Sequence, residues 1–163
     1  MKSIATLLMT AIFLSASGIA ASAQNDQEKC ARWSTEFFLR EFKSSKSSLS
    51  SVFANFAQER CMAGDGCDFQ SHYNRQQDKC FILVTVEGNI PSEAKPSYRM
   101  LLLYDAYERL DYGTFWSKQY RNGEVEVINC WLKGKFGVTP LSEPPACKSG
   151  HEFLDAIKPY LEK

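Results

Sequence analysis

The chain has 163 residues and balances 19 Lys and Arg against 19 Asp and Glu, so its formal net charge at pH 7 is zero. Because phosphate binding needs a surplus of basic residues, this balance argues against nucleic acids and anionic membrane surfaces as partners. A composition that is 44% hydrophobic and 13% aromatic is typical of a folded globule and excludes a disordered chain.

The first 23 residues have the features of a secretory signal peptide. Lys2 supplies the positive charge, Ile4 to Leu14 the apolar run, and Ala21-Ser22-Ala23 the small-residue cleavage pattern. The apolar run is about half as long as the ~20 residues that span a bilayer, so we expect a cleaved signal. The sequence predicts export to the periplasm or the medium, with a single mature domain over 24–163 and no stable membrane span in it.

All six cysteines lie in the predicted mature part, and an even number in an exported chain indicates disulfides. Sequence alone permits many connectivities. The spacing favours a small loop closed by the second and third cysteines and a bridge by the last two across a proline-rich return, which leaves the first and fourth. The expected pairs are Cys30 with Cys80, Cys61 with Cys67, and Cys130 with Cys147.

We expect no metal and no cofactor. No cysteine pair has the tight C-x2-C spacing of zinc ribbons and fingers, and an oxidising compartment favours disulfides over thiolate ligands. Asp65 and Asp68 resemble a calcium loop only superficially, because an EF-hand spreads its ligands over a longer loop that ends in a bidentate Glu.

Helical spacing of apolar residues marks the start of the mature chain. It predicts an amphipathic helix from Gln27 to Phe42, supported by an i,i+4 pair of Glu28 with Arg32 in the favoured order. The serine-rich segment 43–51 has no periodicity and indicates a flexible loop. Order resumes at 52–56, where the pattern leaves helix and strand open.

β-Formers dominate the middle of the chain. The segment 69–74 is ambiguous, whereas 80–86 is a continuous run of β-formers, typical of a central strand that is buried on both faces. A loop with glycine and prolines over 87–97 then leads to a second apolar strand over 98–107.

A hairpin is predicted next. Asn122-Gly123 indicates a two-residue turn between strands 114–121 and 124–132, because both turn positions need positive φ. In that register Arg121 lies opposite Glu124, and Tyr120 lies opposite Val125.

A second helix is expected at the C-terminus. Ser149 and Glu152 form a capping box at its start, and Pro159 is expected to kink it or end it early. Its expected apolar face contains Leu154, Ile157 and Leu161. The order of elements predicts an α+β fold, with an antiparallel sheet of about four strands packed against N- and C-terminal helices and held by three disulfides.

The segment Ser71-His72-Tyr73-Asn74, followed after four residues by Lys79-Cys80-Phe81, is the densest polar group in the chain. It resembles a segment of an uncharacterised family of small exported bacterial proteins. The stretches 103–108 and 152–162 are similar to later parts of such proteins. The resemblance implies an exported bacterial domain and brings no activity or catalytic residue with it.

The same segment supplies the candidate binding residues, which are His72, Tyr73, Asn74, Arg75 and Lys79. An imidazole that titrates near neutral pH beside two cationic side chains is able to hold an anionic group. The alternative is structural: the polar run supplies turn and loop hydrogen bonds, and Tyr73 packs in the core.

A hydrolase is the second interpretation. His72 and His151 would act as general base and acid, and Lys79 would stabilise a phosphate, which follows the logic of secreted ribonucleases. Against it, His151 falls in the first turn of the expected final helix, where the positive end of the helix dipole disfavours an imidazolium.

The position of the three tryptophans bears on whether the protein has an exposed binding surface. Trp33, Trp116 and Trp131 are expected to fill the core, and the alternative is an exposed aromatic patch that contacts a protein or a glycan. We expect a non-enzymatic binding or inhibitor-like module whose partner is an envelope or extracellular protein or a glycan. The alternatives are a small secreted, phosphodiesterase-like hydrolase that uses His72 and a structural component of the cell envelope.

Overall fold

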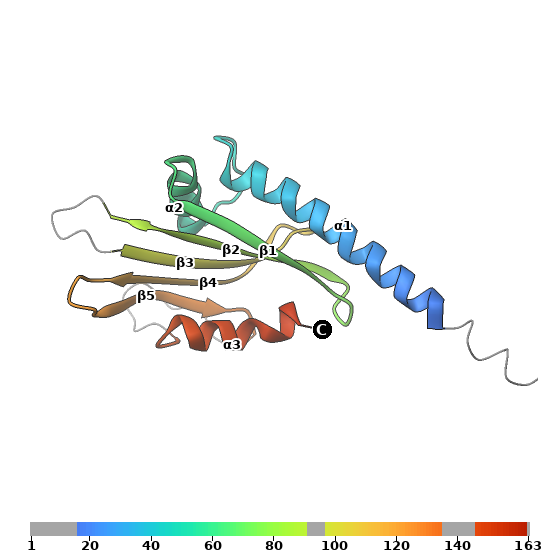
Figure 1. Cartoon of the computed structure of the whole chain (residues 1–163). Helices are drawn as coiled ribbons and strands as arrows, with labels where there is room; N and C mark the ends of the chain where they lie inside the picture. The colour runs from blue at the N-terminus through green and yellow to red at the C-terminus, as the bar shows by residue number, and fades with distance from the viewer. Residues whose placement is uncertain (1–15, 91–96, 135–145, 163) are drawn as a thin grey trace, which may run out of the picture.

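The computed structural model describes residues 16–90, 97–134 and 146–162. Two helices precede the strands, and one helix follows them (Figure 1). The helices are α1 (Ala16–Phe42), α2 (Val52–Met62) and α3 (Gly150–Leu161). The strands are β1 (Gly66–Asn74), β2 (Lys79–Asn89), β3 (Ser97–Asp105), β4 (Leu110–Gln119) and β5 (Val125–Leu132).

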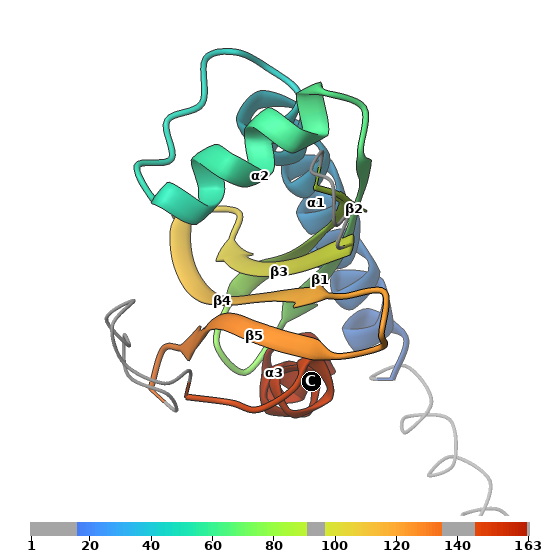
Figure 2. The ribbon, with the colours of Figure 1, turned by 90° about the vertical axis from the view of Figure 1, so that its left-hand side faces the viewer.

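The five strands form one antiparallel sheet in the order β1-β2-β3-β4-β5, so each strand pairs with its neighbours in the chain. Figure 2 shows α1 and α2 on one face of this sheet and α3 on the other. One apolar cluster fills each side, with Phe37, Phe42 and Tyr104 in the first and Phe115 and Phe153 in the second. The α+β class is therefore confirmed.

The expectation of about four strands is wrong, because β1 adds a fifth. Partly buried Cys67 and Phe69 alternate in it with exposed Asp68 and Gln70. This period of two is the pattern of a half-buried strand at the edge of a sheet. The expected loop over 87–97 is also too long, since β2 continues to Asn89.

The local sequence explains why both N-terminal helices form. The expected helix over 27–42 lies within α1 and buries Cys30, Phe37, Phe38 and Phe42 against the sheet. The segment 52–56, left open by the sequence, begins α2, where the Ser51 side chain accepts a hydrogen bond from the Ala54 amide at 3.3 Å. Trp33 departs from its expected place in the core, because it is 46% exposed.

The hairpin lies where it was predicted, but its register differs by one residue. Val125 pairs with Gln119 and not with Tyr120, whose amide donates to the Glu124 carbonyl at 2.8 Å. The turn therefore has three residues. Gly123 has φ +83°, and Asn122 does not have the positive φ that a two-residue turn requires.

The predicted capping box begins α3. The Ser149 side chain accepts from the Glu152 amide at 3.2 Å, as predicted. The reciprocal bond differs, since the Glu152 carboxylate accepts from the Lys148 amide at 2.8 Å and not from the amide of Ser149. The helix does not end at Pro159 but continues to Leu161. Its buried face is centred on Phe153, Ala156 and Ile157, whereas Leu154 and Leu161 are only partly buried.

The three expected disulfides are confirmed, as Cys30–Cys80, Cys61–Cys67 and Cys130–Cys147. The first joins α1 to β2, and the second joins α2 to β1. The third joins β5 to the segment that leads into α3. Each helix is therefore linked to the sheet by one disulfide. The cysteine on the helix side lies within α1 and within α2, and just before the start of α3.

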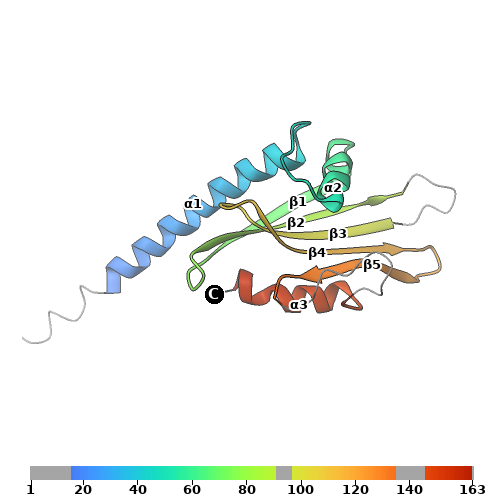
Figure 3. The same ribbon diagram turned by 180° about the vertical axis from the view of Figure 1, so that it is seen from behind.

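The predicted signal peptide falls mostly on residues 1–15, which lie outside the described part of the chain. The expected cleavage site after Ala23 lies within α1, whose N-terminal end projects beyond the sheet (Figure 3). Within the described ranges, no helix combines the length and the apolar character of a membrane span.

Candidate functional site

The predicted binding residues lie on the hairpin formed by β1 and β2, but they do not form one site. His72, Tyr73 and Asn74 end β1, Arg75 lies in the exposed turn, and Lys79 begins β2. Because side chains alternate along a strand, Tyr73 packs on the α1 side whereas Asn74 reaches α3 on the other side. The sheet itself therefore separates them.

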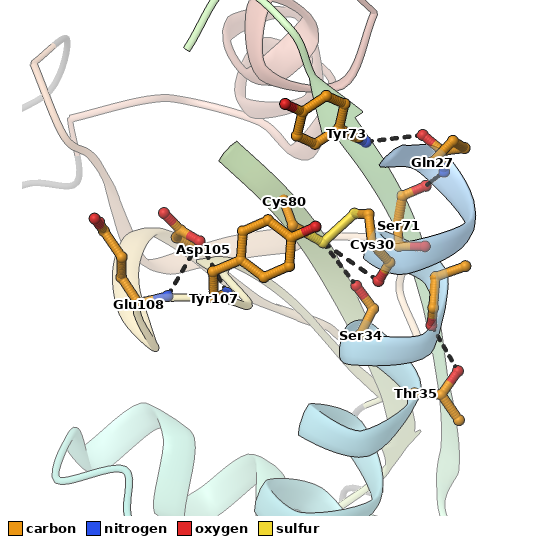
Figure 4. Close-up of a disulfide and its surroundings, with 11 residues drawn as sticks. Gln27, Cys30, Ser34, Thr35, Ser71, Tyr73, Cys80, Asp105, Tyr107 and Glu108 are labelled. Carbon is orange, nitrogen blue, oxygen red and sulfur yellow. Dashed lines mark hydrogen bonds between the residues drawn. A yellow bond between two sulfur atoms is a disulfide. The ribbon is translucent and has the colours of Figure 1, made fainter. Parts of the chain in front are cut away.

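Tyr73 makes hydrogen bonds within the protein, and Figure 4 shows its backbone beside the Gln27 side chain. Its amide donates to the Gln27 side chain at 2.9 Å (Figure 4). Its hydroxyl donates to Asp78 Oδ1 at 2.5 Å. The bond to Asp78, with partial burial, raises the pKa of Tyr73 to about 12. Gln27 belongs to α1, so its bond with the Tyr73 amide joins the hairpin to the helix close to the Cys30–Cys80 disulfide.

Lys79 is occupied as well. Its Nζ lies 2.7 Å from Asp105 Oδ2 and also binds Glu108, while Asp105 accepts from the Tyr107 and Glu108 amides in the β3–β4 turn (Figure 4). Although desolvation alone would lower the pKa of Lys79, the bonds to Asp105 and Glu108 outweigh it and raise that pKa. This cation anchors a turn.

The two histidines of the hydrolase alternative lie on different elements. His72 is partly buried on β1, opposite Phe81. The His151 side chain, in the first turn of α3, is 86% exposed, and its Nε2 lies 3.3 Å from Asp155 Oδ2. His72 is two residues from Asn74, which binds the last turn of α3, whereas His151 lies in the first turn of the same helix, so the geometry gives no support to a histidine acid–base pair.

A different pocket lies between the serine-rich loop and the β3–β4 turn, and we name it the serine-loop pocket. Its volume is about 250 Å³. The lining residues are Ser48, Leu49, Ser50, Ser51, Tyr104, Arg109, Leu110 and Asp111. Figure 2 shows the loop between α1 and α2 on the side of the sheet where β3 turns into β4.

Tyr104 is the most deeply buried residue of this pocket. The side chain is 1% exposed, and its ring packs against Phe37 at 5.4 Å and Phe42 at 6.1 Å. Its hydroxyl has no hydrogen-bond partner among the described residues. A buried polar group left in this state costs about 1–3 kcal/mol, so the missing partner of this hydroxyl requires an explanation.

Glu41 does not line the pocket, but it binds the serine-rich loop that forms one of the pocket walls. It is fully buried, and its carboxylate accepts from the Ser48 amide at 2.6 Å, from two serine hydroxyls and from Arg40 Nε at 2.6 Å. Burial alone would raise the pKa of Glu41, but these hydrogen bonds outweigh it and lower that pKa. Both carboxylate oxygens are therefore committed to holding the loop.

Asp111 and Arg109 supply the charges of the pocket. Burial raises the pKa of Asp111 to about 6, and a hydrogen bond from the Gly113 amide at 3.2 Å offsets part of this effect. Arg109 has φ +57°, a left-handed conformation that turns the chain between β3 and β4. With one guanidinium and one carboxyl group, the pocket lining is close to electrically neutral at pH 7.

Larger hollows lie along the strands near Glu87 and Arg99, with volumes of about 620 and 370 Å³. The two charged residues that both hollows share pair with each other, since Arg99 Nε lies 2.9 Å from Glu87 Oε1. Both side chains are about half exposed, at 48% and 55%. This is the usual state of a solvated sheet surface, whereas the serine-loop pocket contains a buried group without a partner.

Two charged residues in apolar surroundings are sequence signals for this pocket, although hydrophobic periodicity does not reveal their role. Glu41 stands in the buried stripe of α1 beside Phe38 and Phe42, where a charge requires partners. Asp111 stands among the β-formers at the start of β4. Neither signal identifies Tyr104, because its missing partner depends on how the serine-rich loop packs.

Comparison with protein-family models, with curated proteins and with solved structures finds no match to this chain. The resemblance based on residues 71–81 therefore stays a prediction. The function has to be argued from the pocket itself.

Proposed function

We propose that this protein is an exported, non-enzymatic binding module that holds a hydroxyl-bearing ligand, such as a saccharide unit, in the serine-loop pocket. The observation that carries the proposal is Tyr104, a fully buried residue of the pocket lining whose hydroxyl has no partner among the described residues. Such a group is retained at a cost to stability, which a ligand that completes its hydrogen bond would offset.

The character of the lining favours a neutral polar ligand. The charges of Arg109 and Asp111 balance, and serine hydroxyls stand beside them. Leu49 and Leu110 supply apolar walls of the kind that pack against the C–H groups of a sugar ring. A balanced, hydroxyl-rich pocket suits a saccharide better than a phosphate or another strong anion.

The pocket favours binding over catalysis. A carboxylate pair with diverging pKa values is typical of acid–base enzymes, and Glu41 and Asp111 have such values. Glu41, however, is fully buried and all its hydrogen-bonding capacity is directed to Arg40 and the loop. It has no access to a substrate, so Asp111 would lack a second catalytic group.

The experiment is a glycan-array screen of the oxidised protein, followed by NMR mapping of each bound saccharide. We expect perturbed amides at 48–51, 104 and 109–111, and a binding loss of about tenfold in Tyr104→Phe, the value of one hydrogen bond. Tyr112→Phe, which removes a hydroxyl on the opposite side of the sheet, is the control and should bind as the wild type does. Saccharide binding that maps elsewhere, or that survives Tyr104→Phe unchanged, would contradict the proposal.

A further inference from the structure

A second pocket, independent of the first, lies between α2 and β4, and we name it the Trp116 pocket. Its volume is about 220 Å³. The lining residues are Phe56, Arg60, Ile90, Trp116 and Lys118. At the volume of liquid water, about 30 Å³ per molecule, this space equals about seven waters, which suits one aromatic ring or a short acyl chain.

The body of the Trp116 pocket is apolar and aromatic. The Phe56 ring lies 5.4 Å from the Trp116 ring, and Phe53 approaches the same indole at 6.1 Å. Ile90, directly after β2, adds an aliphatic wall. Sites for small molecules combine such a lining with a few polar groups that fix the orientation of the ligand.

One of these polar groups is the indole of Trp116. Its Nε1 is buried and has no acceptor among the described residues. On the neighbouring strand the side-chain amide of Asn129, which pairs with Trp116 across the sheet, lacks a partner for its Nδ2 as well. Indole and amide nitrogens are donors, so the feature missing on this face is an acceptor.

The rim of the pocket is cationic. Lys118 Nζ lies 5.6 Å from the centre of the Trp116 ring, and no ion pair joins it to a carboxylate in the described ranges. Glu126 is its neighbour across the strands, but that carboxylate accepts from the Tyr120 hydroxyl at 2.7 Å.

Arg60 contributes less net charge. Its guanidinium is bound by Asp65 at 2.5 Å and by the Asn89 carbonyl at 3.1 Å. Among the described residues, Lys118 is therefore the cation of this rim that has no ion pair.

We infer that the Trp116 pocket binds a small monocarboxylate with an apolar body, either an aromatic ring or a short acyl chain. The apolar part occupies the space between Phe56, Ile90 and the indole. The carboxylate supplies the missing acceptor and pairs with Lys118, an arrangement that an apolar alcohol or an inorganic anion cannot reproduce. Shape, acceptor and charge thus converge on one class of ligand.

The test uses benzoate and hexanoate as probes on the oxidised, isotopically labelled protein. The readout is the indole N–H resonance of Trp116. We expect a saturable shift with both probes, and a much smaller one with benzyl alcohol, which lacks the charge, and with acetate, which lacks the apolar body. In Lys118→Gln the apparent affinity for benzoate should fall about tenfold, as expected for losing one charge-assisted hydrogen bond.

Lys133→Gln is the matched control, because Lys133 Nζ also lies over an aromatic ring, that of Tyr112 at 4.6 Å, but outside this pocket. It should leave benzoate binding unchanged. The proposal is overturned if neither carboxylate shifts the Trp116 resonance of the wild-type protein up to its solubility limit. Equal responses to benzoate and benzyl alcohol, or equal losses in the two lysine variants, would overturn it as well.

Discussion

The side-chain amide of Asn74, at the end of β1, donates to the carbonyl oxygen of Pro159 in the last turn of α3 at 2.8 Å. A second bond reaches the Tyr160 carbonyl at 3.3 Å. The last carbonyls of a helix have no partner within the helix, so one buried amide satisfies two of them. The Asn74 Oδ1 also accepts from the Gln77 amide in the β1–β2 turn.

We expect Asn74→Ala to lower the free energy of unfolding by about 2–3 kcal/mol, because it removes three hydrogen bonds of a buried side chain, to Pro159, Tyr160 and Gln77. Urea unfolding with the disulfides intact measures the change. Gln76→Ala, at an exposed position of the same turn, is the control and should stay within about 0.5 kcal/mol of the wild type. A similar small effect in Asn74→Ala would show that the link to α3 contributes little.

Glu41→Gln should release the serine-rich loop. The substitution removes a buried charge that accepts four hydrogen bonds or more, at an expected cost of about 2–4 kcal/mol. Hydrogen exchange at the Ser48 amide should accelerate, whereas Glu36→Gln, exposed on the same helix, should leave it unchanged. Protection of the Ser48 amide that survives Glu41→Gln would refute this role.

The lowered pKa of Glu41 also fixes the direction of its pH dependence. Its contribution to stability is present above the unfolded value of about 4.5 and is lost as the pH falls through the lower folded value. We expect the difference in stability between the wild type and Glu41→Gln to shrink below pH 4.5 and to be constant above it. Thermal unfolding of both proteins from acid to neutral pH measures this difference.

Asp111 acts in the opposite direction. Its pKa is raised from 3.8 to about 6, so the folded state binds more protons than the unfolded state between these values. Stability therefore falls as the pH rises through this window. Asp111→Asn should be more stable than the wild type at pH 8, by on the order of 1 kcal/mol, and lose this advantage at pH 3. A pKa below 4 for Asp111, measured by NMR of its carboxyl carbon, would contradict the prediction.

The disulfides should differ in what they contribute. By loop entropy, Cys30–Cys80 with a separation of 50 residues stabilises the fold by up to about 4 kcal/mol, and Cys61–Cys67 with a separation of 6 by about 2 kcal/mol. Paired Cys→Ala variants compared by urea unfolding measure both values. A larger loss on removing the short loop than the long one would show that local packing outweighs chain entropy here.

The disulfide pairs and the location of most elements could be predicted from the sequence. Turn and capping residues act on their neighbours in the chain, and the spacing of six cysteines favours one set of pairs. Cys61 and Cys67 are close in the chain, and Gly123 marks its turn with a residue that tolerates positive φ. The hairpin register was predicted wrongly, since the sequence Asn-Gly suits both a two-residue and a three-residue turn. The choice between them depends on the paired strands, including the irregularity between Trp116 and Ser117.

The binding candidates were less predictable. A polar run such as 71–75 has the same composition whether it contacts a ligand or the protein, and in Asn74 the partner lies 85 residues further along the chain. The missing partner of the Tyr104 hydroxyl could not be predicted either, because the sequence around Tyr104 is that of an ordinary buried strand. Whether the Tyr104 hydroxyl has a hydrogen-bond partner depends on how the serine-rich loop, distant in sequence, packs against it.

The connectivity of the cysteines has a consequence for biogenesis. Cys30 pairs with Cys80, and the Cys61–Cys67 bridge is nested between them. If the chain is exported as we propose, the first cysteine to leave the secretion channel must not join the next one. An oxidase that couples thiols in their order of emergence would produce a wrong Cys30–Cys61 link, which exchange through mixed disulfides then has to correct. Correct maturation of this chain should therefore depend on a disulfide isomerase, and its yield should fall in cells that possess an oxidase alone.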